Sequence, residues 1–526
     1  MTPSFNLVDE PWIPCLFANG DTDELCLYDA LARAHEVREI FDSSPLVVTA
    51  THRLLLAILH RNFGPESLTD WKKLWEKGHW NDAPLCDYFK RWRHRFDLFH
   101  SERPFYQVPK MENATEHPVQ KLAEEAAWGN NPTLFDHNYK DRPIPMTPAQ
   151  AARYVVAYQA FAVAGLAGPN QVNFSDAPLT RGYSVLVLGG NLFETLALNL
   201  LPTPWDEEND QPFWEQDSLV KSDKRGTYPR GLADYFTWQS RHLHLISQGN
   251  SSVTKCQIVQ NLKLPEGFHH DPFKCYRKDE QRQMLLPLKI DPEKSLWRDS
   301  HTLLQKAGNL PGRGGSSQRP EVFNWLARIQ NVLPRQDVRF SITGLAADQA
   351  KVFLWRHERL PLPLAYLEDN EGLIEALKRA ISLSEDVSQI LNYSLYQVAQ
   401  LILTPDFNPK DKKSRKPDSK TVKNLLKSWA TGGLYWSRLG VPFLSLLVAL
   451  PDDQEMDDEY GTVYGSTQLP QWGQVLRQAA QETFNTITGG LGGSWRALKA
   501  AAQVEGRFQA ALADKISEGG EHEAEE

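Results

Sequence analysis

Alternating polar and apolar residues between positions 337 and 358 predict a pair of β-strands. Residues 338–343 (VRFSIT) alternate with a period of two, which places one face of a strand against a core. A second β-prone run begins at Val352. Residues 344–350 between the runs are mostly small, with the longer amide side chain of Gln349 near the end, so we expect a hairpin loop. This loop is either an ordinary connection or a rigid wedge that the two strands hold out.

Hydrophobic periodicity elsewhere predicts a mixture of strands and helices before residue 363. The expected strands are a hairpin over 12–27 with its turn at Asn19-Gly20, and runs at 183–188, 235–246 and 284–290. The expected helices cover 46–63, 68–75, 88–99, 148–164, a segment from 192, 296–304 and 322–333.

After residue 363 the pattern becomes helical throughout. The helical blocks, whose number and spacing are typical of a four-helix bundle, are 373–403, 422–450, 472–487 and 495–512. The sequence thus predicts the α+β class, with a large mixed α/β N-terminal domain over 1–363 and a C-terminal four-helix bundle over 364–516. Residues 517–526 are acidic, and we expect them to form a disordered tail.

Composition limits the kinds of partner. The 57 Lys plus Arg residues against 66 Asp plus Glu give a formal net charge of −9, so nucleic-acid contacts are expected to use local patches. The five cysteines are scattered, which is typical of reduced thiols in a cytosol. We see no apolar run of membrane-spanning length and no signal segment, and therefore expect a cytoplasmic protein without a membrane partner.

Motifs for common catalytic sites are absent from the sequence, including HExxH, GxSxG and paired CxxC. Cys256, His269 or His270, and Cys275 could be drawn as a zinc site, but their spacing matches no standard finger. The loop 312–317 contains glycines without the pattern of a nucleotide-binding P-loop. These observations favour a binding protein without a cofactor.

Three irregular regions are candidates for binding. Residues 128–146 interleave aromatic and cationic side chains, which suits RNA or a partner protein, although a loop of this length could also be disordered. Residues 165–182 carry glycines, prolines and asparagines, and they form either a plain connection or a loop that approaches a ligand closely. Residues 255–273 are expected to be irregular and include Lys255 and Lys263.

A run of basic residues links the first two helical blocks of the bundle. It contains the most concentrated positive charge in this acidic protein, at Lys410, Lys412, Lys413, Arg415, Lys416, Lys420 and Lys423. Such a run is usually a solvated loop, and the alternative is a contact with a nucleic-acid backbone.

Several stretches together resemble one family. These stretches are Asn6-Leu7-Val8-Asp9-Glu10-Pro11-Trp12-Ile13-Pro14, Trp238-Gln239-Ser240, Gly344 with Asp348-Gln349-Ala350 and Arg356-His357-Glu358, and Leu434-Tyr435-Trp436. In their order and spacing the chain resembles, over essentially its whole length, the large subunit (CasA) of the type I-E CRISPR surveillance complex, Cascade.

The resemblance implies a non-catalytic subunit that recognises the protospacer-adjacent motif (PAM) of target double-stranded DNA through the minor groove. It would help to start R-loop formation and support recruitment of a separate helicase-nuclease. The family's glutamine wedge corresponds to Gln349, with Asp348 beside it. Its glycine-rich loop corresponds to the segment Asn170-Gln171-Val172-Asn173, where asparagines and a valine replace glycines. The family's lysine finger corresponds first to Lys263 and second to Lys255.

The resemblance also implies partners. Phe135, Asp136 and His137 correspond to the segment that anchors the subunit near the 5′ handle of the guide RNA (crRNA). The expected partners are the backbone, handle-binding and small subunits, crRNA, target DNA and the helicase-nuclease. Two alternatives remain at this point: a scaffold subunit that binds protein and guide RNA without reading DNA, and an unrecognised metal hydrolase.

Overall fold

The computed structural model describes most of the chain. The described residues are 4–112, 114–124, 144–167, 172–202, 209–217, 226–248, 252–268, 270–279, 281–282, 284–291, 294–309, 316–333, 337–348, 351–368, 370–407, 411, 413–457 and 461–521. The chain forms two compact units, one made of Met1–Pro292 with Lys306–Leu360, and one made of Glu293–Gln305 with Pro361–Glu526. We call them the N-terminal unit and the C-terminal unit.

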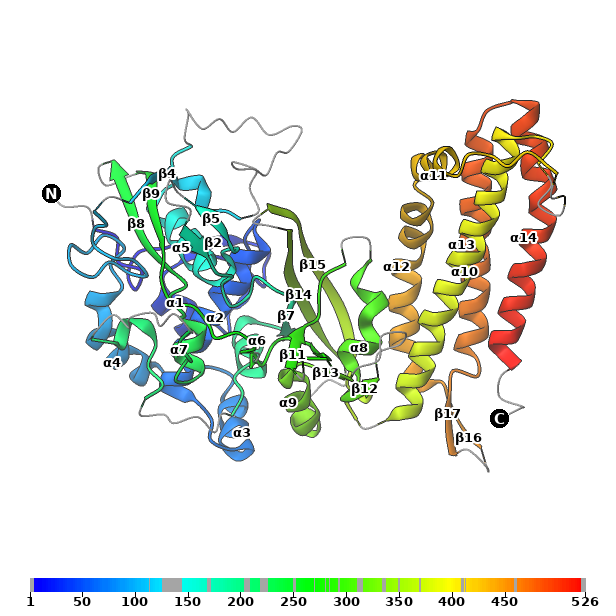
Figure 1. Ribbon diagram of the computed structural model, residues 1–526. Coiled ribbons are helices and arrows are strands. Elements are labelled where there is room, and N and C mark those ends of the chain that lie inside the picture. The colour runs from blue at the N-terminus through cyan, green and yellow to red at the C-terminus, as the bar shows by residue number, and fades with distance from the viewer. Residues whose placement is uncertain are drawn as a thin grey trace. The chain divides into compact units, whose positions relative to one another are not determined.

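The N-terminal unit mixes short helices with small sheets (Figure 1). Its helices are α1 (Leu27–Ala32), α2 (Pro45–Phe63), α3 (Leu68–Lys77), α4 (Asp82–Trp92), α5 (Pro148–Phe161), α6 (Leu192–Leu198), α7 (Leu232–Phe236) and α9 (Glu321–Ile329). Its strands are β1 (Ile13–Phe17), β2 (Thr22–Leu25), β3 (Val37–Ile40), β4 (Glu116–Pro118), β5 (Gly165–Ala167), β6 (Val172–Phe174), β7 (Tyr183–Leu188), β8 (Arg241–Gln248), β9 (Ser252–Gln260), β10 (Tyr276–Asp279), β11 (Met284–Pro287), β12 (Ala307–Asn309), β13 (Ser316–Gln318), β14 (Asp337–Asp348) and β15 (Lys351–Pro363).

Helix α2 is a long and largely buried helix of the N-terminal unit. Ser44 caps its first turn by accepting a hydrogen bond from the Val47 amide, and Pro45 occupies the first helical position. The run from Pro45 to Leu59 is almost entirely buried, and it packs against α5 and α7. A helix that is buried on all its faces in this way lies inside the core.

The strands of the N-terminal unit form several separate sheets. Their orders are β2-β1-β3, β4-β9-β8, β5-β6, β15-β14-β7 and β11-β10-β13-β12. Strand β7 pairs antiparallel with β14 in a register that joins Tyr183 to Gly344 and Leu188 to Arg339. This pairing connects the strand that follows the glycine-containing region 165–182 with the strand that leads to Asp348.

Three expectations for the N-terminal unit are wrong in detail. The helix expected over 88–99 is α4, which begins at Asp82 because the Asn81 side chain accepts from the Ala83 amide, and which ends at Trp92. The strand expected over 235–246 begins only at Arg241. The residues before it form α7, whose first amides donate to the Asp210 carboxylate. The first part of the region 255–273, expected to be irregular, belongs to β9.

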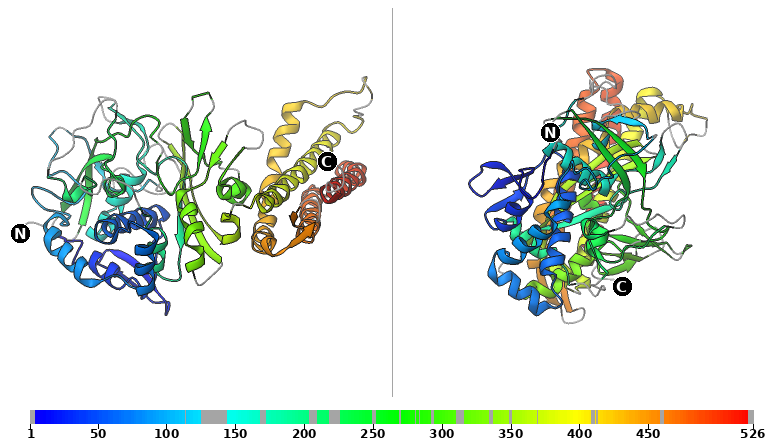
Figure 2. Two further views of the ribbon diagram at one scale, coloured as in Figure 1. Left: turned by 90° about the horizontal axis from the view of Figure 1, so that it is seen from below. Right: turned by 90° about the vertical axis from the view of Figure 1, so that its left-hand side faces the viewer.

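The C-terminal unit is mainly helical, as expected (Figure 2). Its elements are α8 (Ser300–Leu304), α10 (Glu371–Leu403), α11 (Ser419–Ser428), α12 (Thr431–Ala449), β16 (Gln454–Asp457), β17 (Gly461–Tyr464), α13 (Gln468–Gly490) and α14 (Trp495–Glu521). Helix α10 packs against α14 and α13, and α13 also packs against α12 and α14. These contacts confirm the C-terminal helical bundle.

The bundle differs from the sequence expectation at three places. The single helix expected over 422–450 is two helices, α11 and α12, because Ala430 takes a left-handed conformation with φ of 48°. The hairpin of β16 and β17 was not predicted. Residues 517–521, expected to be disordered, complete the last helix, α14.

Residues of the segment 293–305 pack into the bundle. The Trp297 ring stacks on Phe443 with centroids 4.3 Å apart, and the Arg298 guanidinium lies 3.6 Å from the centroid of Trp436. Arg298 also pairs with Glu385 of α10 at 2.5 Å. These contacts explain why this segment belongs to the C-terminal unit although it precedes Pro361 in the chain.

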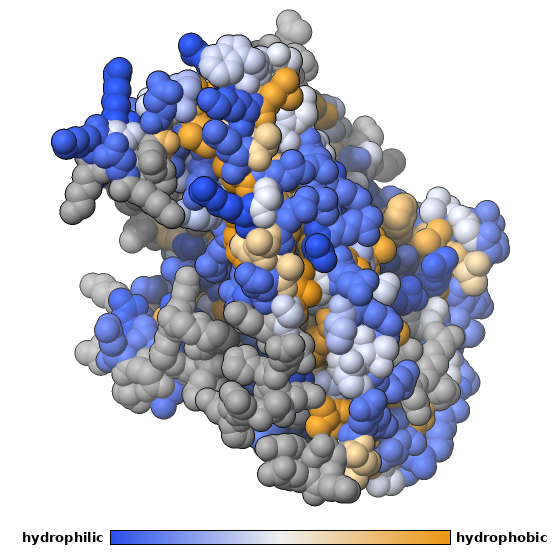
Figure 3. All heavy atoms as spheres, turned by 90° about the vertical axis from the view of Figure 1, so that its right-hand side faces the viewer, coloured by the Kyte–Doolittle hydropathy of each residue, from blue (hydrophilic) through white to orange (hydrophobic). Residues whose placement is uncertain are grey.

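The stretch Ser419–Asp452 is long and apolar enough to cross a membrane by length and composition alone, contrary to the expectation from the sequence. A core helix of a soluble bundle passes the same test. The stretch contains the break at Ala430, and its buried residues Leu439, Phe443 and Leu447 face the bundle. Figure 3 shows another face, viewed from the side on which α14 lies in Figure 1, and this face carries hydrophilic side chains with apolar ones between them.

Candidate nucleic-acid interface

The segment that resembles a glycine-rich loop lies on a short hairpin. Strands β5 and β6 pair antiparallel, with Ala167 opposite Val172 and Gly165 opposite Phe174. Asn170 and Gln171 lie outside the described residues, and Val172 and Asn173 begin β6. The region therefore contains two paired strands rather than a plain connecting loop.

The base of this hairpin is held by side chains of neighbouring elements. The Asp176 carboxylate accepts from the Ala164 amide at 2.7 Å and from Arg181 Nε at 2.6 Å. The Ser175 amide donates to Gln260 Oε1, at the end of β9, at 2.8 Å. The chain entering β5 and the chain leaving β6 are thus tied to one another and to the sheet of β8 and β9.

Arg241 lies at the centre of these contacts and is fully buried, with 0% of its surface exposed. Its Nη2 donates to the carbonyls of Ser175 at 2.7 Å and Val163 at 3.1 Å, and its Nη1 donates to the Ser240 carbonyl at 3.0 Å. The guanidinium also lies 4.9 Å from the centroid of the Phe174 ring. A rigid fork of five donors can bind carbonyls on two sides at once.

The position of Arg241 is itself fixed by α5. The Arg241 amide donates to Gln159 Oε1 at 2.9 Å, and Gln159 Nε2 donates to the Arg241 carbonyl at 2.8 Å. Ser240 Oγ donates to the Gln159 carbonyl at 2.8 Å. Residues beside the Trp238-Gln239-Ser240 motif therefore connect the core helix α5 to the hairpin base.

A second buried cation holds the chain after the hairpin. Lys274 Nζ donates to the carbonyls of Pro178 and Arg181, both at 2.6 Å. Burial lowers the pKa of the Lys274 ammonium from 10.5 to about 8. The nearby Asp271 carboxylate favours the charged form, and Asp271 in turn pairs with Arg53 at 2.8 Å.

The hairpin of β14 and β15 is longer than predicted. Both strands continue through most of the expected loop, so that β14 ends at Asp348 and β15 begins at Lys351. The loop expected over 344–350 is therefore too long, because residues 344–348 belong to β14, in which Leu345 and Ala346 are buried. Gln349 lies outside the described residues.

The two lysines proposed for the finger lie in different settings. Lys255, on β9, pairs with Glu116 at 2.8 Å. The exposed Lys263 follows Leu262, whose amide donates to the Gln239 carbonyl at 3.1 Å. Within the described parts of the chain, Lys263 has no ion pair within 4 Å. Lys263 also lies only three residues after Gln260, which binds the hairpin base.

The basic link between the first two bundle blocks is partly described. Lys410 and Lys412 lie outside the described residues, whereas Lys413, Arg415 and Lys416 are exposed. Helix α11 continues the basic surface with the exposed side chains of Lys420, Lys423 and Lys427. We call 413–427 the basic segment.

Comparison with known proteins decides the family. The model of the CRISPR-associated protein Cse1 family matches residues 6–483. The CRISPR-associated protein CasA/Cse1 of Thermus thermophilus is 34% identical over 516 residues, covering 96% of each chain. The chain belongs to the Cse1 family.

Solved structures give the same fold. Cse1 from Acidimicrobium ferrooxidans matches with a TM-score of 0.81 and 25% identity, covering 98% of this chain and 99% of that chain. A chain in a structure described as a CRISPR RNA-guided surveillance complex matches with a TM-score of 0.72 and 20% identity, covering 97% and 100%. The α+β fold expected from the sequence is thereby confirmed.

Two further expectations for this Cse1-family chain concern the docking residues and a zinc site. The proposed docking residues Phe135, Asp136 and His137 lie outside the described residues. His269 also lies outside them, and the described residues contain no group of His, Cys, Asp and Glu that could hold a metal ion. Cys256 is fully buried, and burial raises the pKa of its thiol to about 12.

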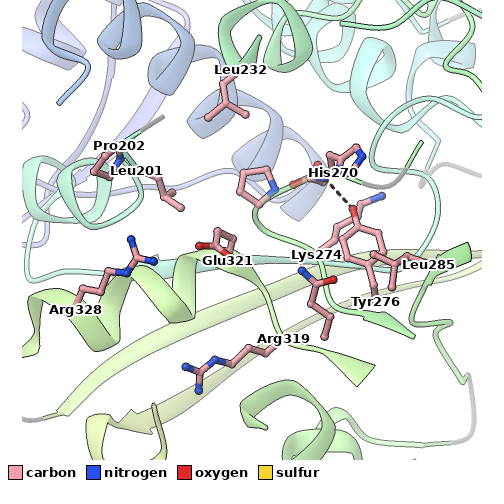
Figure 4. Close-up of a pocket in the computed structure, with 13 residues that line it drawn as sticks. Leu201, Pro202, Leu232, His270, Lys274, Tyr276, Leu285, Arg319, Glu321 and Arg328 are labelled. Atoms are coloured by element: carbon pink, nitrogen blue, oxygen red, sulfur yellow. Dashed lines mark hydrogen bonds between the residues drawn. The ribbon is translucent and has the colours of Figure 1, made fainter. Parts of the chain in front are cut away.

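A cavity of about 540 Å³ was not predicted from the sequence (Figure 4). Arg328 and Glu321 of α9 lie on one side of it in Figure 4, and Lys274 and Tyr276 lie on the other. The Tyr276 hydroxyl accepts from the Asp271 amide at 2.9 Å. Because the lining mixes cationic, acidic and apolar groups, it indicates no single class of ligand.

Sequence reasoning missed Arg241 and Lys274. The motif Trp238-Gln239-Ser240 stands directly before Arg241 and was the available signal for it. Cations are usually exposed, so residue type alone would place both of these side chains at the surface.

Proposed function

We propose that this chain is the non-catalytic large subunit of a CRISPR RNA-guided surveillance complex, and that it recognises the PAM in target double-stranded DNA. Membership of the Cse1 family supports this proposal. It is supported further by a fold shared with a chain in such a complex. The proposed partners are the other subunits, crRNA, target DNA and a separate helicase-nuclease.

The observation that carries the DNA-reading role is the anchored β5–β6 hairpin. Asn173 belongs to β6, and the base of the hairpin is fixed by Arg241, Gln260 and Asp176. An asparagine amide can donate to the acceptors of the minor groove, where A·T and G·C pairs differ chiefly by the guanine amino group. A fixed base keeps such a contact in register with the DNA.

We assign strand opening to Gln349 at the tip of the β14–β15 hairpin. Exchange of DNA pairing for RNA–DNA pairing is nearly balanced, so the first unstacked step limits the process. A side chain that offsets the few kcal/mol of unstacking at that step would raise the opening rate. Strand β14, which precedes Gln349 in the chain, is paired with β7 from Arg339 to Gly344.

The test uses the assembled complex with a PAM duplex, a duplex with an altered PAM, and a target whose PAM-proximal base pairs are already mismatched. Asn173→Ala should reduce the preference for the PAM duplex on both closed and pre-opened targets. Gln349→Ala should retain the preference but open DNA more slowly, and pre-opened DNA should restore its rate. Equal rescue of both variants, or none for Gln349→Ala, would exclude this division of roles.

A pair of lysine variants serves as a matched control. Lys263→Ala should weaken binding to the PAM duplex, whereas Lys255→Ala should not, because Lys255 already pairs with Glu116. If the wild-type complex binds both duplexes equally, the subunit is a scaffold that does not read DNA.

A further inference from the structure

The hairpin that carries the proposed DNA-reading residues is too small to hold its own shape. Strands β5 and β6 contain three residues each, and they pair with no further strand among the described residues. An isolated two-stranded hairpin is at best marginally stable in water. Its geometry must therefore be imposed by the contacts at its base.

One guanidinium binds the chain on both sides of the hairpin. Arg241 binds the Val163 carbonyl, just before β5, and the Ser175 carbonyl, just after β6, at 3.1 and 2.7 Å. It thus closes the excursion that leaves the core at Val163 and returns at Ser175. The guanidinium also contacts the ring of Phe174, the last residue of β6.

The surroundings of Arg241 are rigid. The side chain of Gln159 in α5 forms hydrogen bonds with both the amide and the carbonyl of Arg241. The Nη1 atom of Arg241 donates to Gln260 Oε1 at 3.3 Å. Gln260 Oε1 also accepts from the Ser175 amide at 2.8 Å. Movement of the guanidinium would therefore move the hairpin base relative to α5 and β9.

We propose that Arg241 is the positioning residue of the PAM-reading hairpin, setting the place of Asn173 without touching DNA itself. This inference rests on the function proposed above. According to this inference, the fully buried side chain of Arg241 affects which DNA sequence the complex prefers, in addition to any effect on stability. Binding groups must be held within about 0.5 Å of the productive geometry, so a small displacement of the hairpin is enough to weaken a base contact.

Arg241→Lys tests the proposal in the assembled complex. Lysine keeps the positive charge but offers a single nitrogen, which cannot bind the carbonyls on both sides as the planar fork does. We expect the ratio of affinities for the PAM duplex and the altered-PAM duplex to fall by about tenfold or more. Thermal unfolding of the isolated subunit is measured in parallel.

Arg153→Lys is the matched control. Arg153 is also buried, and it binds the Trp12 carbonyl at 3.1 Å and Glu24 at 2.6 Å, away from the β5–β6 hairpin base. Both variants should lower the unfolding temperature. Only Arg241→Lys should lower the affinity ratio, whereas a merely structural role would leave the ratio at the wild-type value.

Gln260→Leu provides a second test that leaves Arg241 in place. It removes the acceptor for the Ser175 amide, and it should lower the affinity ratio in the same direction. An unchanged ratio in an assembled Arg241→Lys complex overturns the proposal. If that variant does not assemble, an unchanged ratio for Gln260→Leu overturns it.

The two proposals fail in different ways. If the wild-type complex shows no PAM preference, the proposed function fails. If the wild type shows the preference and Asn173→Ala loses it while Arg241→Lys retains it, only the positioning role of Arg241 fails.

Discussion

Gly344 lies where β14 passes close to Gly182 and Ile290. A Cβ at this position would lie 2.8 Å from the Gly182 carbonyl oxygen and 2.5 Å from Ile290 Cδ1. The pairing of Gly344 with Tyr183 leaves the strand little room to shift away from this carbonyl. The need for glycine here is therefore a matter of space between two strands.

Gly344→Ala should lower the free energy of unfolding by about 1–3 kcal/mol, because the added methyl group must displace backbone or Ile290. Chemical unfolding of the isolated subunit would measure this. Gly440→Ala, in α12, is the control, since a Cβ there meets nothing within 4 Å. An unaltered stability for Gly344→Ala would show that β14 can move at this point.

Among single elements, helix α2 places two titratable histidines inside the core. Burial lowers the pKa of His52 and of His60 from 6.5 to about 4. His52 is 4% exposed, and its Nδ1 lies 2.7 Å from the Val48 carbonyl oxygen. An unfolded chain protonates these imidazoles near pH 6.5, while the folded chain keeps them neutral, so stability falls as the pH drops from 6.5 toward 4.

His52→Leu should remove part of this pH dependence. The change in unfolding free energy between pH 7.5 and pH 5 should become smaller by about 2 kcal/mol, as proton linkage requires for one such histidine. Denaturant unfolding at several pH values measures it. His35→Leu replaces an exposed histidine and is the comparison. Parallel curves for the wild type and His52→Leu would mean that His52 is not the group responsible.

At the scale of the whole molecule, the formal charge of −9 conceals a local excess of positive charge. The exposed cations of the basic segment are Lys413, Arg415, Lys416, Lys420, Lys423 and Lys427. On α11, Lys420, Lys423 and Lys427 are spaced by three and four residues, so they share one helix face. The buried Val422 lies on the opposite face.

Changing Lys413, Arg415 and Lys416 to glutamine should weaken DNA binding by the assembled complex equally on PAM and altered-PAM duplexes. Phosphate contacts carry no sequence information, and each lost contact should reduce the salt slope by about 0.9. Binding titrations at several salt concentrations measure this. The same change at Lys72, Lys73 and Lys77 of α3 controls for net charge. An unchanged salt slope would show that the basic segment does not contact DNA.

Elements whose signals are local could be predicted from the sequence. The hydrophobic pattern is mixed before residue 363 and helical after it. The helices that begin at Pro45 and Pro148 are each capped by the residue directly before the proline. Amphipathic repeats and caps depend on residues within one or two turns, so they can be recognised without the fold.

Only the tertiary structure decided which polar residues are buried and what they hold. Arg241 binds the Ser175 carbonyl across 66 positions of sequence, and Lys274 binds the Pro178 carbonyl across 96. The length of the β14–β15 hairpin depends on the burial of Leu345 and Ala346, which no local pattern indicates. Burying a cation costs free energy unless acceptors from distant segments converge on it, and that convergence exists only in the folded chain.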